Sequence, residues 1–265
     1  MTAYSTISES DLPPINHVLE RLSTVEVIQW ALSVFPRIAF LTSGQRTGSI
    51  LAKIIYQMGV KVDLIFADTG VLFPETHDTI EKISSSYQLP LKRYTPALSM
   101  TEQTEKYGVL YLNHAGQEQC CHMRKVEPLL ELHEDYEALL SPLRRGEGGQ
   151  RSRVPIMDLD INFNVVRISP LANLSDEEYQ QYLHEDDTII NPLHAQGFPT
   201  IGCIRCTTPV RDDEPRRAGR WRHLSGVDYC GINPSDFSHK TASIELPQEV
   251  VQSLKTSFSD AENRK

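Results

Sequence analysis

Three short apolar runs with helical patterns between them constrain the fold of this chain more than any other feature. The runs are long enough for buried strands and too short for helices, and they span residues 37–42, 61–67 and 91–94. Helical periodicity separates them at 50–58 and 74–87. This β-α-β-α-β alternation predicts an α/β fold with a parallel sheet and helices on both faces.

Weaker patterns extend this unit toward the C-terminus. We predict helices at 101–107 and 120–133, the second with two adjacent cysteines in its first turn. Short apolar runs at 138–141 and 164–168 predict a fourth and a fifth strand.

Two helix starts carry clear capping signals. An amphipathic pattern over 12–34 is broken at Ser23, a residue suited to be an N-cap. Ser175 should cap a later helix, with Glu178 at the capping-box position.

Regular patterns fade near the C-terminus and leave only a short amphipathic piece near Val250. No internal repeat is present. We therefore expect an N-terminal helical segment at 1–36, a main domain at 37–232 and a flexible, irregular tail at 233–265.

Charge and hydropathy exclude several function classes. The formal net charge of −9 argues against non-specific nucleic-acid binding as the main task. No apolar run reaches about 18 residues and no N-terminal signal pattern is present, so we expect a cytoplasmic protein without a membrane span. The five cysteines are odd in number and include an adjacent pair, which favours metal ligands plus a reactive thiol over a disulfide framework.

A polar, glycine-containing loop connects the first predicted strand to a helix. Backbone N–H groups in such a loop, together with the helix N-terminus, can hold phosphate, although the loop alone equally fits a tight connection that binds nothing. It lacks the lysine of a Walker loop and the third glycine of a dinucleotide fingerprint. A second polar turn ends the neighbouring strand at the edge where α/β sheets bind ligands. The residues expected to bind nucleotide are Ser43, Gly44, Gln45, Asp68, Thr69 and Gly70.

Four cysteines have the spacing of metal ligands. Cys203 and Cys206 form a CxxC pair, while Cys120 and Cys121 are adjacent. Thiolates of this kind bind either zinc or an iron–sulfur cluster. The adjacent pair favours a cluster, because neighbouring cysteines are awkward ligands for a single tetrahedral zinc ion. The alternative, small buried hydrophobes, suits a single cysteine of the pair better than the whole set.

Arginines gather in two stretches of this otherwise acidic chain. A solvated basic face is one explanation, but an anion-binding cleft fits the overall negative charge better. The eight residues are Arg144, Arg145, Arg151, Arg153, Arg216, Arg217, Arg220 and Arg222.

Several motifs in consistent order make the chain resemble the assimilatory adenylyl-sulfate and phosphoadenylyl-sulfate reductases. The resemblance covers roughly residues 38–230 and implies their PP-loop adenine-nucleotide fold, a Rossmann-like parallel sheet. The matching pieces are 66–70, 72–76, 120–129, 169–173, 191–206 and 217–221.

Within that family, the cysteine pattern is similar to that of the cluster-containing adenylyl-sulfate reductases. The resemblance implies a [4Fe–4S] cluster and a preferred substrate, adenylyl sulfate, without a 3′-phosphate. The implied cluster ligands are Cys120, Cys121, Cys203 and Cys206.

The resemblance also implies which cations contact the substrate. Lys125 matches a family lysine between cluster and sulfate, where a cation offsets negative charge on both. Arg217 and Arg220 match arginines that hold the phosphosulfate, and Arg144 and Arg151 match a further basic loop.

The fifth cysteine, Cys230, matches the family nucleophile. The resemblance implies that its thiolate attacks the sulfur of adenylyl sulfate, expels AMP and becomes an S-sulfonate, from which thioredoxin or glutaredoxin releases sulfite. No thioredoxin-like module is fused to this sequence, so the reductant is expected to be a separate protein. The sequence is compatible with a homo-oligomer.

Three regions depart from the family pattern. Tyr229 and Asn233 replace the usual Glu and His around the last cysteine, the basic loop at 144–148 lacks a Gln and a Ser, and the nucleotide loop at 43–45 lacks its Phe. Two alternatives therefore stay open. One is reduction of phosphoadenylyl sulfate, alone or besides adenylyl sulfate; the other is a cluster-bearing nucleotide sensor without enzymatic activity.

Overall fold

The fold is built on a six-stranded sheet in a computed structural model that describes residues 3–224, 226, 232 and 242–262. All neighbouring strands are parallel except the last pair, which is antiparallel. The predicted α/β parallel sheet is thereby confirmed. In sheet order the strands are β4 (Leu91–Tyr94), β3 (Asp63–Ala67), β2 (Ile38–Thr42), β5 (Ala138–Leu140), β7 (Val165–Ile168) and β6 (Met157–Asp160).

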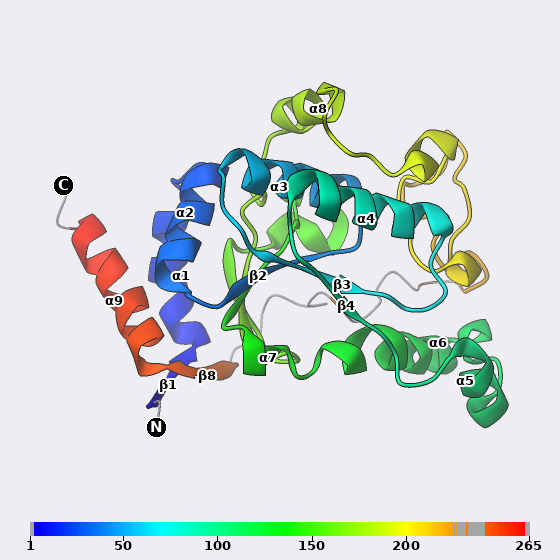
Figure 1. Ribbon diagram of the computed structural model, residues 1–265, viewed down its shortest axis with the longest axis horizontal. Helices are drawn as coiled ribbons and strands as arrows, with labels where there is room; N and C mark the ends of the chain where they lie inside the picture. Colours follow the sequence, from blue (N-terminus) through cyan, green and yellow to red (C-terminus); the bar gives the residue numbers. More distant parts are fainter. Residues whose placement is uncertain (1–2, 225, 227–231, 233–241, 263–265) are drawn as a thin grey trace.

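Helices cover both faces of this sheet, as Figure 1 shows for α3 and α4 on one side and α6 and α7 on the other. Both capping predictions are confirmed, because Ser23 and Ser175 accept hydrogen bonds from backbone N–H groups three residues later. The helices are α1 (Leu12–Leu19), α2 (Thr24–Val34), α3 (Arg46–Gln57), α4 (Pro74–Tyr87), α5 (Met100–Tyr107), α6 (His114–Cys121), α7 (Leu132–Asp135), α8 (Asp176–His184) and α9 (Gln248–Glu262).

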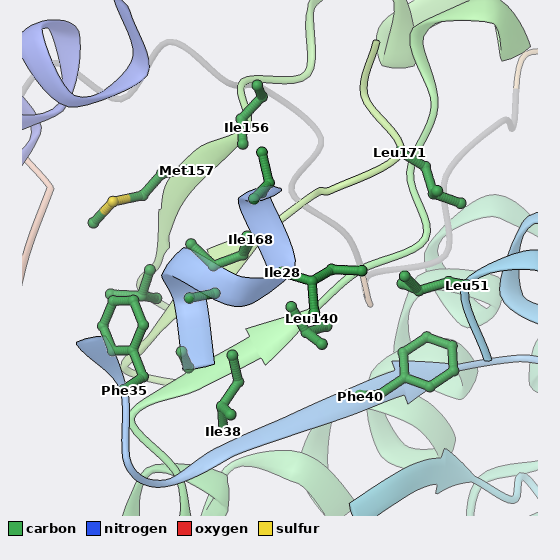
Figure 2. Close-up of a cluster of buried hydrophobic side chains, with 14 of the residues drawn as sticks. Ile28, Phe35, Ile38, Phe40, Leu51, Leu140, Ile156, Met157, Ile168 and Leu171 are labelled. Carbon is green, nitrogen blue, oxygen red and sulfur yellow. The ribbon is translucent and has the colours of Figure 1, made fainter. Parts of the chain in front are cut away.

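Two hydrophobic cores lie on opposite faces of the sheet because side chains alternate along each strand. Phe40 of β2 points into one core, whereas its neighbours Ala39 and Leu41 belong to the other. Figure 2 shows the first core, where Phe40 lies near Leu140 and Leu51. The sheet is thus buried on both sides, and ligands can reach it only at its strand ends.

The helix expected at 120–133 is wrong in its boundaries. Its adjacent cysteines end α6 instead of starting a helix, and a π-helical turn follows at His122–Val126. Pro128 lacks the N–H of a helix interior, and the chain passes through a short 3-10 turn before α7. Asn113 supplies the missed start signal, since its side chain accepts a hydrogen bond from Gly116 N at 2.9 Å.

The prediction of an irregular C-terminal tail is also corrected in part. Strand β8 (Ser243–Pro247) pairs antiparallel with β1 (Tyr4–Ser8), which lies in the N-terminal segment expected to be helical. Helix α9 follows directly and buries Val250 and Leu254 against the core that contains α1 and α2. No local sequence signal indicates pairing between the two ends of the chain.

The edge strand β6 of the main sheet was not predicted either.

Replacing Leu254 with alanine tests this docking of α9. The side chain is 1% exposed, so its loss should lower the free energy of unfolding by ~2–5 kcal/mol. The matched control is Gln252→Ala, an exposed position of the same helix, where little change is expected. Urea denaturation of both variants would measure the difference, and equal stabilities would contradict the packing of α9.

Among the described residues, no helix combines the length and apolar character that a membrane span requires.

Candidate active site

A cleft opens at the carboxyl ends of β2, β3 and β5, the edge at which open α/β sheets bind ligands. The empty space between its walls, including the part open to solvent, is about 1210 Å³. Phe66, Ala67 and Leu143 give it an apolar floor, and segments 199–202 and 216–220 contribute further walls. Residues far apart in sequence are thereby brought to one site.

Seven of the residues predicted to bind substrate line this cleft. They are Ser43, Gln45, Thr69, Lys125, Arg151, Arg217 and Arg220. The structure does not bring the other four, Gly44, Asp68, Gly70 and Arg144, to its lining.

Gln45 lines the cleft and also binds the backbone of Ile201. Its side-chain Nε2 donates to the carbonyl of Ile201 at 2.6 Å, and its Oε1 accepts from the Ile201 N–H at 3.1 Å. This two-point contact ties the loop after β2 to the segment that leads to Cys203. The amide group is therefore used to position a loop.

Asp68 and Gly70 shape the turn after β3. The Asp68 carboxylate accepts a hydrogen bond from Gly70 N at 3.0 Å and lies 3.4 Å from Arg93 Nη1. Gly70 has a φ of 69°, a conformation that favours glycine. The turn presents Thr69 to the cleft, so the predicted tripeptide contributes one direct lining residue.

Arg144 is buried beside the cleft and attached to α8. Its Nη1 donates to Asp176 Oδ1 at 2.7 Å and to the Leu174 carbonyl at 3.2 Å. The guanidinium also stacks over the ring of Tyr179, a cleft-lining residue, at 4.4 Å from the centroid. Arg144 therefore supports a wall of the cleft from behind.

The described part of the cleft lining is strongly basic. It contains six Lys and Arg side chains but a single carboxylate, Glu147, which is ion-paired with Arg151. Arg46 was not among the predicted site residues, whereas Arg216 was predicted as one of the eight arginines of an anion-binding cleft. Arg46 is the first residue of α3, and its place after the nucleotide loop was the available signal. Such a lining suits a ligand with several negative charges.

His194 is a neutral member of this lining. Its Nδ1 donates to the Phe198 carbonyl at 2.7 Å, while its buried Nε2 has no partner. Burial, together with the nearby charges of Arg46 and Arg216, lowers the pKa of His194 to about 4. The imidazole is therefore uncharged at neutral pH and adds no seventh cation.

The guanidinium of Arg220 contacts both the protein backbone and an aromatic ring. Its guanidinium is 4.4 Å from the ring centroid of Trp221, and its Nη1 donates to the Ile201 carbonyl at 3.3 Å. A Cβ atom on Gly202 would come within 2.4 Å of Arg220 Nη2. Glycine at 202 is thus required for this arginine to lie where it does.

The four cysteines predicted as ligands line one smaller cavity next to the cleft. Cys120 and Cys121 come from the end of α6, and Cys203 and Cys206 flank a 3-10 turn. All four are free thiols. Burial, with neighbouring Cys203 and Cys121, raises the pKa of Cys206 to about 12. A cationic metal centre would reverse this effect, since coordinated thiols lose their protons.

Three of these thiols have polar side chains as hydrogen-bond partners. Gln103 Nε2 lies 3.4 Å from the sulfur of Cys120 and Gln117 Nε2 lies 3.1 Å from that of Cys121. The hydroxyl of Thr69 is 3.3 Å from the sulfur of Cys203. Neither glutamine was predicted. The fold brings Gln103 of α5 to its cysteine, whereas Gln117 lies one helical turn before Cys121 in α6.

Trp221 also lines the cysteine cavity and has an unusual conformation. It adopts a φ of 47°, which is rare for a bulky residue and marks a functional constraint. Its indole Nε1 is buried and has no partner. A donor without an acceptor beside four thiols fits a sulfur-rich anionic group in this cavity.

Across the described ranges, no three His, Cys, Asp or Glu side chains are arranged to hold a single metal ion. All four cysteines predicted as ligands nevertheless line the same cavity.

Lys125 connects the two cavities. It lines both the cleft and the cysteine cavity, and its Nζ lies 3.8 Å from the sulfur of Cys121. Lys125 follows that cysteine by four residues and lies in the π-helical turn after α6. Its side chain is buried. A buried ammonium group at this position can act on a cleft ligand and on the thiols together.

Comparisons with known proteins agree with this geometry. The family model for the phosphoadenosine phosphosulfate reductase domain matches residues 37–209. A protein of Staphylococcus epidermidis named adenosine 5′-phosphosulfate reductase is 34% identical over 220 residues, covering 82% of this chain and 89% of the relative. One of the same name from Anoxybacillus flavithermus is 32% identical over 239 residues, covering 89% and 100%.

A solved structure is similar as well. The crystal structure of phosphoadenylyl-sulfate reductase from Candida auris, in a phosphate complex, superposes with a TM-score of 0.64 at 27% identity. The match covers 76% of this chain and 98% of that chain. The predicted PP-loop fold class is confirmed by this likeness. Because the family model extends from β2 through all four cysteines of the cavity, the chain belongs to the phosphoadenosine phosphosulfate reductase family.

Proposed function

We propose that the chain reduces adenylyl sulfate to sulfite and AMP, with a [4Fe–4S] cluster beside its active site and thioredoxin or glutaredoxin as reductant. One observation carries the proposal: Lys125 lines both the basic cleft and the cavity of four thiols. A phosphosulfate group bound among these cations would therefore lie next to the cluster. The names of the relatives support the same activity.

The proposed reaction transfers the sulfonate group to Cys230. The Cys230 thiolate attacks the substrate sulfur, forming an S–S bond as the bond to the bridging oxygen breaks. AMP leaves with the electron pair of that bond. A thiolate of the reductant then attacks the Cys230 sulfur, sulfite departs with the S–S electron pair, and the second reductant thiol closes a disulfide, so the dithiol supplies two electrons.

The cleft residues would bind and orient the substrate. Arg217 and Arg220 would hold the phosphosulfate, and the Lys125 ammonium would offset the charge that develops on the departing oxygen. Fixed cations of this kind need no rearrangement during the reaction, which is why they lower the barrier.

Cys120, Cys121, Cys203 and Cys206 would hold the cluster. When bound, the cluster would supply local electrostatics and fix the two cysteine segments together beside the substrate.

Cys230 lies outside the described residues. Ile232, two positions further along the chain, lines the cleft, and its carbonyl accepts a hydrogen bond from Arg167 Nη2 at 3.1 Å. Arg167 is in turn buried in an ion pair with Asp160. The position of Ile232 in the cleft lining supports the proposal that Cys230 is the nucleophile.

A second substrate has support from a specific observation. Arg46 and Arg216 add two cations to the four cleft-lining residues that the family resemblance assigned to the substrate. Phosphoadenylyl sulfate carries one more phosphate than adenylyl sulfate, and these arginines could offset its charge. We therefore propose that the chain accepts phosphoadenylyl sulfate as a slower second substrate.

Sulfite release from both nucleotides, with thioredoxin and thioredoxin reductase supplied, tests the proposal. We expect faster turnover with adenylyl sulfate and measurable turnover with phosphoadenylyl sulfate. Sulfite release from phosphoadenylyl sulfate but not from adenylyl sulfate would contradict the proposed substrate. A cluster-loaded protein that binds AMP but releases no sulfite from either would instead indicate a nucleotide sensor.

A further inference from the structure

We propose that Gln103 and Gln117 donate hydrogen bonds to the cluster thiolates of Cys120 and Cys121 and thereby set the electronic properties of the cluster. The inference rests on the proposed [4Fe–4S] cluster. Both glutamine side chains are almost completely buried, with 0% and 2% of their surface exposed. Polar side chains at such depth normally have hydrogen-bond partners, and sulfur atoms are the partners here.

Gln117 reaches its sulfur along one helix. It precedes Cys121 by one turn of α6, so the two side chains share a face of that helix. The distance from Nε2 to the cysteine sulfur is 3.1 Å. A free thiol accepts hydrogen bonds weakly, whereas a thiolate is a much better acceptor. This contact therefore gains strength once the cysteine is an anionic ligand.

Gln103 reaches Cys120 from a different helix, α5, and its orientation is fixed. Its Oε1 accepts a hydrogen bond from Arg124 Nη1 at 2.9 Å. Because a guanidinium can only donate, the amide oxygen must face the arginine and the NH₂ group must face the sulfur. Arg124 is itself held by the carbonyls of Thr69, at 2.7 Å, and Leu98, at 3.2 Å.

The adjacent cysteines have a particular need for such donors. Two neighbouring thiolates repel each other in a buried site, and hydrogen bonds spread their charge onto the donors. Hydrogen bonds to the sulfurs are also among the factors that set the potential of an iron–sulfur cluster. The amides should weaken the iron–thiolate bonds slightly and favour the reduced, more negative cluster.

Gln117→Leu tests this role, with Gln119→Leu as its matched control. Gln119 is exposed on the same helix, two residues away. After anaerobic loading, we expect all forms to contain similar iron and acid-labile sulfide. In Gln117→Leu alone, resonance Raman bands for iron–cysteine stretching should shift to higher frequency and the midpoint potential should fall.

Gln103→Leu repeats the test from α5 in case the α6 variant does not fold. Unchanged Raman bands and potentials in both glutamine variants would overturn the inference, because side chains that only fill space would not move them. A wild-type chain without iron and sulfide would refute the proposed cluster itself, and the donor role with it.

Discussion

Replacing Cys230 with serine should slow sulfite release from adenylyl sulfate by about 1,000-fold or more. A serine hydroxyl at neutral pH is a far weaker nucleophile than a thiolate, and the proposed S–S bond cannot form without the sulfur. Thioredoxin-coupled sulfite release measures the loss. The neighbouring change Tyr229→Ser serves as control and should leave most of the activity.

Nucleotide binding should survive the Cys230 change. The basic cleft is built from other residues, so AMP should bind the serine variant as it binds the wild type in calorimetry. If Cys230→Ser released sulfite at the wild-type rate, a different residue or the reductant itself would have to attack the substrate.

Replacing Lys125 with glutamine should lower kcat/KM for adenylyl sulfate by about 100-fold, the cost of losing one preorganised charge at a reacting group. The ammonium lies in the lining of both cavities, 3.8 Å from the sulfur of Cys121. Its removal would leave substrate and thiolates without the cation between them. Steady-state kinetics of sulfite release measure the effect.

Lys106→Gln is the control for this charge change, since Lys106 is exposed on α5. It should have wild-type kinetics. The iron content of Lys125→Gln must be measured as well, because a variant with full iron and unchanged kcat/KM would contradict the bridging role of the lysine.

Local signals predicted much of the sheet and the helices around it. The bounds of α4 and β4 were predicted to the residue, and the caps at Ser23 and Ser175 were found, because periodicity and capping act over a few neighbouring positions. The break after Cys121 was not predicted. There the π-helical turn and Pro128 interrupt a pattern that otherwise reads as one helix.

The features of the fold and the site that were not predicted depend on contacts between segments distant in sequence. The pairing of β1 with β8 joins segments near the two ends of the chain, and no local sequence pattern predicts this pairing. The same holds within the site: Gln45 binds Ile201, and Gln103 reaches Cys120 from another helix. Arg144 illustrates the opposite case, because a motif assigned it to the substrate while the fold uses it to hold α8.

Six of the cations of this acidic chain line one cleft at the carboxyl ends of the strands. With a net charge of −9, a local excess of basic residues must be maintained by structure, through contacts such as that between Arg220 and the backbone at Gly202. A basic cleft of this kind suits a small polyanion as ligand.

Peptide mapping after a single turnover tests the central claim most directly. The reduced, cluster-loaded chain is mixed with adenylyl sulfate in the absence of any reductant, quenched, digested and analysed by mass spectrometry. The account predicts AMP release equal to the protein present and one SO₃ adduct, located on the peptide that contains Cys230. An adduct on any other cysteine, or AMP release without an adduct, would contradict it.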